Sequence, residues 1–190
     1  MAETDPNAEL DADGITVQKF LSRVLFVCPQ AEFADECLRY ARSSLHNVHV
    51  GSWTVSTDTQ ELVKGRHQDE FMVDGPLAGA SMDEYAGVIF VGGEGAPSLT
   101  SDPDALRLAR EAAAAGKLIG AWGYSVSILA AADVVRGRRV TGDVSLKDAV
   151  RKAGGKFTGR QLEVQDNLIT ALDDAAGMRF GKALAAHVGI

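Results

Sequence analysis

Residues 118–125 read LIGAWGYS, and this stretch decides the fold class. The run 118–122 is apolar apart from one glycine, which is typical of a strand buried on both faces of a sheet. Gly123 and Tyr124 predict a turn, and Ser125 predicts the N-terminal cap of a helix over 125–132. A buried strand that passes through a tight turn into a helix is the repeating unit of α/β proteins.

The same unit recurs along the chain. The apolar run 24–27 precedes a helical pattern over 33–45, and the run 85–91 precedes a helix that begins at Asp102 and Pro103. The other predicted elements are a strand over 48–50 that extends toward Trp53, a hairpin insertion within 56–83, a strand over 139–141, a helix over 145–153, a hairpin of 162–164 and 168–170, and a helix over 174–188. Alternating strands and helices predict a doubly wound α/β fold, with a mainly parallel sheet covered by helices on both faces.

Composition narrows the class of protein. The chain has 190 residues, 46% of them apolar and 24% charged, which fits one compact globular domain. Nothing approaches the run of about 18 apolar residues that a membrane span requires. The net charge of -7 argues against nucleic acid and anionic membranes as partners, because both need a dense basic face.

The first twenty residues are acidic and differ from the rest of the chain. They hold five acidic residues against Lys19 alone. We therefore predict an acidic extension over 1–22 and a single domain over 23–190. The extension lacks the basic and apolar regions of a secretory signal, which predicts a cytoplasmic protein.

The metal-binding residue types are too scattered to predict a metal or cofactor site. Cys28 and Cys37 fit neither a CxxC redox pair nor a zinc cluster. No two of the four histidines have the helical i, i+4 spacing that binds a metal. The sequence therefore predicts neither a metal nor a cofactor.

Four segments carry a resemblance to a known family. The chain reads GGEG at 92–95, AAAGK at 113–117, LAAADVVRGRRVT at 129–141 and DNLIT at 166–170. With the turn at 121–125, these segments resemble the DJ-1/PfpI (ThiJ/PfpI) family over about residues 23–188. The resemblance implies a flavodoxin-like, class I glutamine amidotransferase-like sandwich that is commonly dimeric. It also implies a cysteine nucleophile at the sharp turn after a central strand, near a glutamate from the end of the first strand.

The chain departs from the family at both of these positions. Where the family usually reads Ala-Ile-Cys-His-Gly, residues 121–125 read AWGYS, so Gly123 stands at the cysteine position. Alignment through Glu32 and Phe33 places Ala34 at the glutamate position, although a shifted alignment offers Glu32, Asp35 or Glu36. The family's thiol-dependent peptidase, glyoxalase and deglycase activities are therefore not carried over, because glycine has no nucleophilic side chain.

Four side chains are candidates for chemistry beyond the carboxyl ends of the strands, where ligands of such folds bind. Glu94 is the first candidate for a general acid or base, against the alternative of a solvated loop glutamate. Tyr124 either orients a substrate and donates a proton or simply packs. Cys28 follows the first strand and is either a relocated nucleophile or inert. A lone buried cysteine is more often inert. Asp143 either reaches the site or caps a turn.

The remaining candidates bind through the backbone or shape the pocket. Gly93 permits close approach of the main chain to a ligand, and Gly123 opens volume next to Trp122. The turn at Ser125 begins a helix. We therefore expect its N–H groups and those near Gly93 to donate hydrogen bonds to a carbonyl or enolate oxygen of a ligand. Such donors are worth about 2.7–4 kcal/mol each in acyl-transfer enzymes.

These observations predict a small-molecule enzyme that works without a thiol. The hypothesis is proton transfer on a carbonyl-bearing metabolite, of the lyase, hydratase, isomerase or cyclase kind. The family resemblance implies that the protein is a homodimer. One alternative is a non-catalytic pseudoenzyme that binds or senses a metabolite. A further alternative is thiol chemistry relocated to Cys28.

Overall fold

The computed structural model describes residues 8–10, 16–18 and 22–189. Most of the predicted acidic extension, residues 1–7, 11–15 and 19–21, lies outside the described residues. Within it, β1 (Ala8–Leu10) and β2 (Thr16–Gln18) pair antiparallel, a pairing that the sequence reasoning did not include.

A seven-stranded sheet forms the centre of the molecule, in the order β13-β14-β10-β9-β3-β5-β8. Its strands are β3 (Ser22–Val27), β5 (Val50–Ser56), β8 (Gly75–Pro76), β9 (Gly87–Phe90), β10 (Leu118–Trp122), β13 (Leu162–Gln165) and β14 (Leu168–Ala171). All neighbours are parallel except β13 and β14. The parallel strands β5, β3, β9, β10 and β14 follow the flavodoxin-like order, which confirms the predicted fold class.

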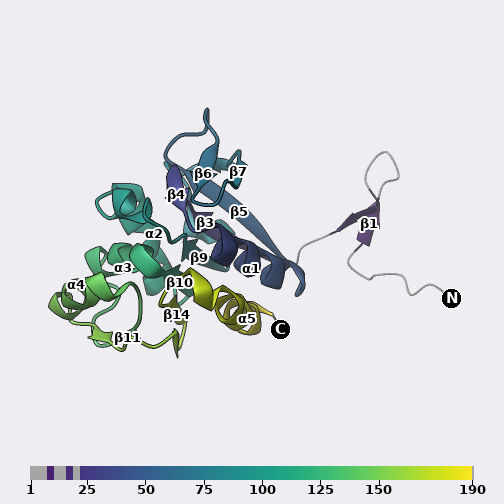
Figure 1. Cartoon of the computed structure of the whole chain (residues 1–190). Helices are drawn as coiled ribbons and strands as arrows, with labels where there is room; N and C mark the ends of the chain where they lie inside the picture. The colour runs from purple at the N-terminus through teal and green to yellow at the C-terminus, as the bar shows by residue number, and fades with distance from the viewer. Residues whose placement is uncertain (1–7, 11–15, 19–21, 190) are drawn as a thin grey trace.

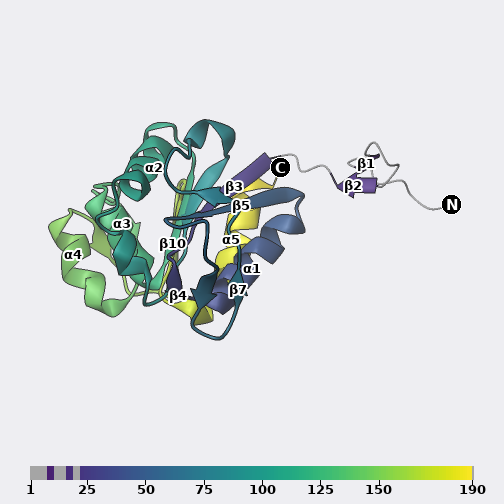
Figure 2. The same ribbon diagram turned by 90° about the horizontal axis from the view of Figure 1, so that it is seen from above.

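Helices cover both faces of this sheet (Figures 1 and 2). One face carries α1 (Asp35–His46) and α5 (Gly177–Val188), and the other carries α2 (Pro103–Ala114), α3 (Val126–Ala131) and α4 (Lys147–Lys152). Side chains of β3 alternate between two cores: Val24 and Phe26 pack with α1 and α5, whereas Leu25 and Val27 pack with α2 and α3. The sheet is therefore buried on both sides, as its apolar strands predict.

Short 3-10 turns join several of these elements. They are η1 (Met82–Glu84), η2 (Ala96–Leu99), η3 (Gly123–Ser125), η4 (Val144–Leu146) and η5 (Asp174–Ala176). α2 begins as predicted: the carboxylate of Asp102 accepts hydrogen bonds from the N–H groups of Asp104 and Ala105, and Pro103 occupies the first turn.

The predicted insertion is a hairpin that belongs to a small second sheet. β6 (Val63–Gly65) and β7 (Glu70–Phe71) pair antiparallel, and β4 (Ala31–Phe33) joins β6. The three strands lie together beyond the carboxyl end of β3 (Figure 1). A parallel pair of β11 (Arg139–Val140) and β12 (Lys156–Phe157) completes the described fold.

The strand predicted over 48–50 begins later than expected. His49 has a φ of +57°, a left-handed conformation that no strand adopts, so the strand starts at Val50 and continues to Ser56. A positive φ at a histidine is uncommon, and the apolar pattern alone does not indicate it.

Candidate functional site

A small hollow of about 90 Å³ lies at the carboxyl ends of the central strands. We call it the elbow hollow. It is lined by Ala34, Arg66, Gly93, Trp122, Gly123, Tyr124, Asp143, Asp173 and Asp174. Trp122 is the last residue of β10, and the others come from the segments that follow β4, β6, β9, β10, β11 and β14, so the hollow lies where doubly wound folds bind ligands.

Two glycines in the lining have left-handed backbone angles for different reasons. Gly93 has a φ of +115°, and a Cβ there would lie 2.2 Å from the carbonyl oxygen of Glu32, so no side chain fits. Gly123 has a φ of +56°, but a Cβ there would meet only the carbonyl oxygen of Leu172, at 4.0 Å. Gly123 is therefore required by its backbone angle, and the space beside it is open.

The indole of Trp122 forms a buried wall beneath this turn. Its side chain is 1% exposed and packs against Phe180, with 5.4 Å between the ring centroids. Its Nε1 is buried without a hydrogen-bond partner in the described part of the chain. A Cβ at Gly92 would lie 2.5 Å from this nitrogen, which explains the glycine at that position.

Ser125 has a structural role that differs from the predicted one. Its side chain does not cap α3. The hydroxyl accepts a hydrogen bond from the N–H of Trp122 at 3.1 Å and donates toward the carbonyl oxygens of Phe90 and Trp122 at 2.8 and 2.9 Å. Ser125 is fully buried, so it joins β9 to β10 and does not line the hollow.

Tyr124 and Asp143 do line the hollow. Tyr124 is half-buried. The carboxylate of Asp143 accepts hydrogen bonds from the N–H and the hydroxyl of Ser145, at 2.9 and 2.6 Å. It therefore caps η4, and the residue is also part of the lining of the hollow.

Glu94 and Cys28 lie away from the hollow. Glu94 is exposed on the loop after β9 and is not part of the lining. Cys28 is completely buried, and burial raises the pKa of its thiol. Cys37, the second cysteine of the chain, is also buried with a raised pKa, so neither thiol has the low pKa and exposure of a reactive cysteine.

Asp174 is a lining residue that the sequence reasoning missed. Its Oδ1 accepts a hydrogen bond from the N–H of Cys37 at 2.7 Å, and its Oδ2 accepts one from the Nη2 of Arg66 at 3.4 Å. Burial raises the pKa of its carboxyl group, the contacts with Cys37 and Arg66 lower it, and Glu36 and Asp35 raise it. Asp174 lies three residues beyond the end of β14 (Leu168–Ala171), so the rule that sites lie at the carboxyl ends of strands points to this loop.

Arg66 reaches the hollow from the β6–β7 hairpin, which a buried carboxylate holds in place. Asp35 accepts hydrogen bonds from the N–H groups of His67 and Asp69, at 2.8 and 3.1 Å. A Cβ at Gly65 would lie 2.0 Å from Oδ1 of Asp35, so glycine makes room for this carboxylate. The N–H of Arg66 donates to the carbonyl oxygen of Phe33, which fixes the residue at the edge of the hollow.

Comparison with known proteins gives a consistent result. The DJ-1/PfpI family model matches residues 22–187. The chain belongs to the DJ-1/PfpI family. It is 24% identical over 153 residues to Deglycase PfpI of Pyrococcus furiosus, covering 78% of this chain and 89% of that protein. 

Solved structures of the family share the fold. A ThiJ/PfpI domain protein of Brachyspira murdochii superposes with a TM-score of 0.83 at 22% identity, covering 87% of this chain and 95% of that chain. DJ-1beta of Drosophila melanogaster superposes with a TM-score of 0.78 at 22% identity, covering 89% and 91% of the two chains. At these identities the structures establish the fold of this DJ-1/PfpI chain.

A shifted alignment offers three acidic residues for the family's glutamate position in this DJ-1/PfpI chain, and these residues do not line the hollow. Ala34 lines the hollow, and its N–H donates to the carbonyl oxygen of Gly92. Glu32 and Glu36 are exposed, and Asp35 holds the hairpin. None of these three carboxylates is part of the described lining.

Within 8–10, 16–18 and 22–189, no group of three or more His, Cys, Asp or Glu side chains is placed to hold a metal ion. In that same part of the DJ-1/PfpI chain, no helix combines the length and apolar character needed to cross a bilayer.

Proposed function

We propose that this DJ-1/PfpI protein binds a small carbonyl-bearing metabolite in the elbow hollow and transfers protons on it without a thiol. The observation that carries the proposal is the carboxyl group of Asp174, which lines the hollow and has a raised pKa. A carboxyl group perturbed by burial in a pocket is a candidate general acid or base. The proposal takes Gly123 to stand at the family's cysteine position and Ala34 at its glutamate position.

The lining supports a division of roles. Asp174 takes the place of Glu94 as acid or base, because Glu94 is exposed outside the hollow. We expect the hydroxyl of Tyr124 and the guanidinium of Arg66 to orient the carbonyl oxygen. The first N–H groups of η3 have no helical acceptor, so we expect them to stabilise the negative charge that develops there.

The proposed step is an enolisation that needs no redox partner. The Asp174 carboxylate removes a proton from the carbon next to the carbonyl group, and the electron pair moves to the carbonyl oxygen. With an α-hydroxy carbonyl substrate the product of this step is an enediolate. The proton returns to the same carbon, or to the former carbonyl carbon while the hydroxyl proton moves to the original carbonyl oxygen; in a lyase, the electron pair of the enolate instead expels a leaving group from the carbon next to the deprotonated one. A hollow of about 90 Å³ fits a substrate of a few heavy atoms.

Deuterium exchange tests the proposal without knowledge of the natural substrate. Hydroxyacetone in D2O should lose its methylene proton signals faster with the protein than without it, as followed by proton NMR. Asp174→Asn should slow the protein-dependent exchange by about a hundredfold or more, because general-base catalysis contributes about 10²–10⁴-fold.

The neighbouring carboxylate provides the matched control. Asp173→Asn removes the same charge from an exposed residue of the same lining, and we expect it to retain exchange within a few-fold. Exchange that survives in Asp174→Asn, or that disappears in Glu94→Gln, would contradict the assignment of the base to Asp174.

A non-catalytic binding module is the second candidate. It is favoured by one observation: both oxygens of Asp174 already accept hydrogen bonds, from Cys37 and Arg66. A metabolite that shifts the amide signals of Gly93 and Tyr124 without any deuterium exchange would support binding alone. Thiol chemistry at Cys28 predicts rapid alkylation at neutral pH, whereas its complete burial favours slow labelling.

Three coarser expectations accompany this proposal. We propose a cytoplasmic location, a single domain over 23–190 preceded by an extension over 1–22, and a homodimer. The homodimer is supported by family membership, because DJ-1 family proteins are commonly dimeric.

A further inference from the structure

A second cavity, of about 280 Å³, lies at the β5–β8 edge of the main sheet. We call it the Trp53 cavity. The residues that line it include two aromatic residues, two acidic residues and two small loop residues: Trp53, Tyr85, Asp74, Glu84, Gly75 and Ser81. It shares no lining residue with the elbow hollow, so it is separate from the site proposed above.

The aromatic rings of this cavity already attract a cation. The guanidinium carbon of Arg23 lies 5.5 Å from the ring centroid of Trp53 and 5.9 Å from that of Tyr85. Both distances are within the range of a cation–π interaction, and tryptophan and tyrosine are the strongest aromatic partners for it. The ring pair therefore has the electrostatic character that binds a positive charge.

The two carboxylates lie in the same electrostatic neighbourhood. Asp74 is fixed in place because its Oδ2 accepts a hydrogen bond from the N–H of Thr54 at 2.7 Å. Burial raises the pKa of the Tyr85 phenol, and Glu84 and Asp74 raise it further, whereas Arg23 lowers it. The Tyr85 phenol is thus influenced by one positive group, Arg23, and two negative groups, Asp74 and Glu84. These three groups together carry an excess of negative charge beside the rings.

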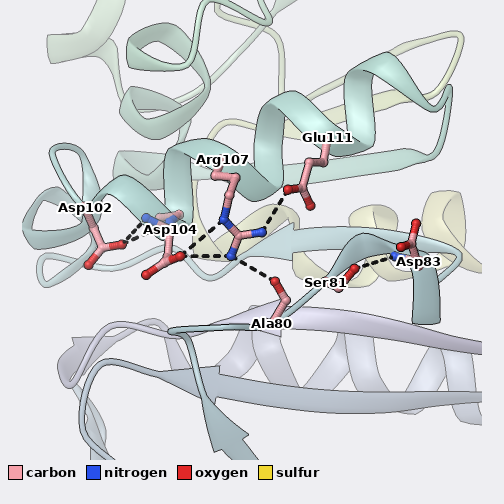
Figure 3. Close-up of polar contacts among 8 residues, drawn as sticks. Ala80, Ser81, Asp83, Asp102, Asp104, Arg107 and Glu111 are labelled. Carbon is pink, nitrogen blue, oxygen red and sulfur yellow. Dashed lines mark hydrogen bonds and ion pairs between the residues drawn. The ribbon is translucent and has the colours of Figure 1, made fainter.

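Polar contacts with α2 and within the loop order residues 80–83 (Figure 3), and Ala80 and Ser81 of this loop line the cavity. Arg107 donates to the carbonyl oxygen of Ala80 at 2.9 Å and is itself held by Asp104 and Glu111. The hydroxyl of Ser81 accepts a hydrogen bond from the N–H of Asp83. Because these contacts order the loop before any ligand arrives, binding does not have to supply that ordering.

We propose that the Trp53 cavity binds a small organic cation of the alkylated ammonium class. A methylated ammonium is weakly hydrated and fits against aromatic faces, and the Asp74 and Glu84 carboxylates supply the opposite charge. A neutral molecule of the same shape gains neither contribution. The site is independent of the chemistry proposed for the elbow hollow.

A matched pair of ligands tests the role of charge. Choline and its neutral isostere 3,3-dimethylbutan-1-ol are titrated into the full-length protein labelled with nitrogen-15. The chain has two tryptophans, so two indole N–H signals are expected, and Trp53→Phe assigns them. Choline should shift the Trp53 signal saturably and leave that of Trp122 in place. Equal shifts with the neutral isostere would overturn the proposal.

Adjacent carboxylates supply the matched protein variants. Glu84→Gln should weaken choline binding about two- to fivefold, as expected for one partly exposed charge pair. Asp83→Asn removes the same charge one residue away, outside the described lining, and should change the affinity less. Equal losses in the two variants would indicate general electrostatic attraction and would overturn a defined site.

Arg23→Gln gives a result of opposite sign. Removing the guanidinium removes a positive charge that competes for the Trp53 and Tyr85 rings, so choline should bind more tightly than to the parent protein. Loss of choline binding in this variant would show that the rings do not accept an incoming ammonium.

Discussion

Gly123 and Gly116 have similar backbone angles but different surroundings. Their φ values are +56° and +64°; nothing lies within 4 Å of a Cβ at Gly116, whereas Gly123 lines the elbow hollow. Alanine at either position should cost about 1–2 kcal/mol of unfolding free energy, because L residues resist the left-handed region. Thermal unfolding should show this as a decrease in Tm of about 2–4 °C per kcal/mol.

The two substitutions should differ in ligand binding. We expect Gly123→Ala to reduce the effect of hydroxyacetone on the amide signals around the hollow, because its methyl group occupies part of about 90 Å³. Gly116→Ala, at the end of α2, should leave those shifts unchanged. A Gly123→Ala protein that binds hydroxyacetone like the parent would show that the open side of this glycine is not where the ligand lies.

At the scale of elements, Asp35 determines whether the β6–β7 hairpin stays against α1. Its buried carboxylate accepts two N–H groups of the hairpin, and asparagine has only one acceptor oxygen. Asp35→Asn should therefore lose about 1–3 kcal/mol of unfolding free energy in urea denaturation. Hydrogen exchange over residues 63–71 should become faster, because the hairpin loses its anchor.

The exposed ion pair at the same junction is the control. Asp69→Asn breaks the ion pair between Asp69 and Arg39, which are 3.2 Å apart. Both side chains are well exposed. Such a pair contributes about 0–1 kcal/mol, so both stability and exchange over 63–71 should change little. Equal effects of the two variants would mean that surface charge, and not the buried carboxylate, holds the hairpin.

The long elements were predictable from sequence, whereas the two-residue strands β8 and β12 were not. The apolar runs that form β3, β9 and β10 can be recognised from their composition, because strands buried on both faces do not alternate between apolar and polar residues. β8 and β12 have two residues each, too few for any periodicity. Their pairing depends on neighbours that lie far away in the sequence.

Part of the candidate site was likewise predictable from the sequence, and part was not. Gly93 and Gly123 directly follow strands, so topology alone places them at the hollow. The positions of the Ser125 hydroxyl and the Cys28 thiol depend on side-chain direction, and both point into packed structure. The contact between Asp174 and Cys37 joins residues 137 positions apart, which no local pattern indicates.

At the scale of the whole molecule, strand order determines where the hollow lies. From β3 the chain passes to β5 on one side, and β9 returns to the other side of β3. The connections after β3 and β9 therefore lead to helices on opposite faces of the sheet, α1 and α2. Ala34 and Gly93 come from these two connections, which meet at the carboxyl edge through the hydrogen bond from Ala34 to Gly92. The place of the site follows from this topology, whereas its chemistry depends on which side chains the loops supply.

The α1–α5 face offers the surface on which we expect a second copy to pack. Tyr40 is 44% exposed and Met178 is 51% exposed, and a Cβ at Gly177 would lie 3.0 Å from the Tyr40 ring, so the two helices meet there. Glu36 and Arg39 border a hollow beside Tyr40, and a twofold axis would pair each with its opposite charge on the partner. Light scattering should give a mass near twice the 20.1 kDa of one chain.

Tyr40→Asp should shift this mass toward that of a single chain, because a carboxylate buried without a partner at an interface is costly. Val144→Asp is the control: Val144 is 71% exposed in η4, which leads into α4 on the opposite face of the sheet, so the dimer should persist. A parent protein with the mass of one chain would contradict the homodimer. A Tyr40→Asp protein that remains dimeric would place the interface on another face, and the charge pattern of Glu36 and Arg39 would then have no role in assembly.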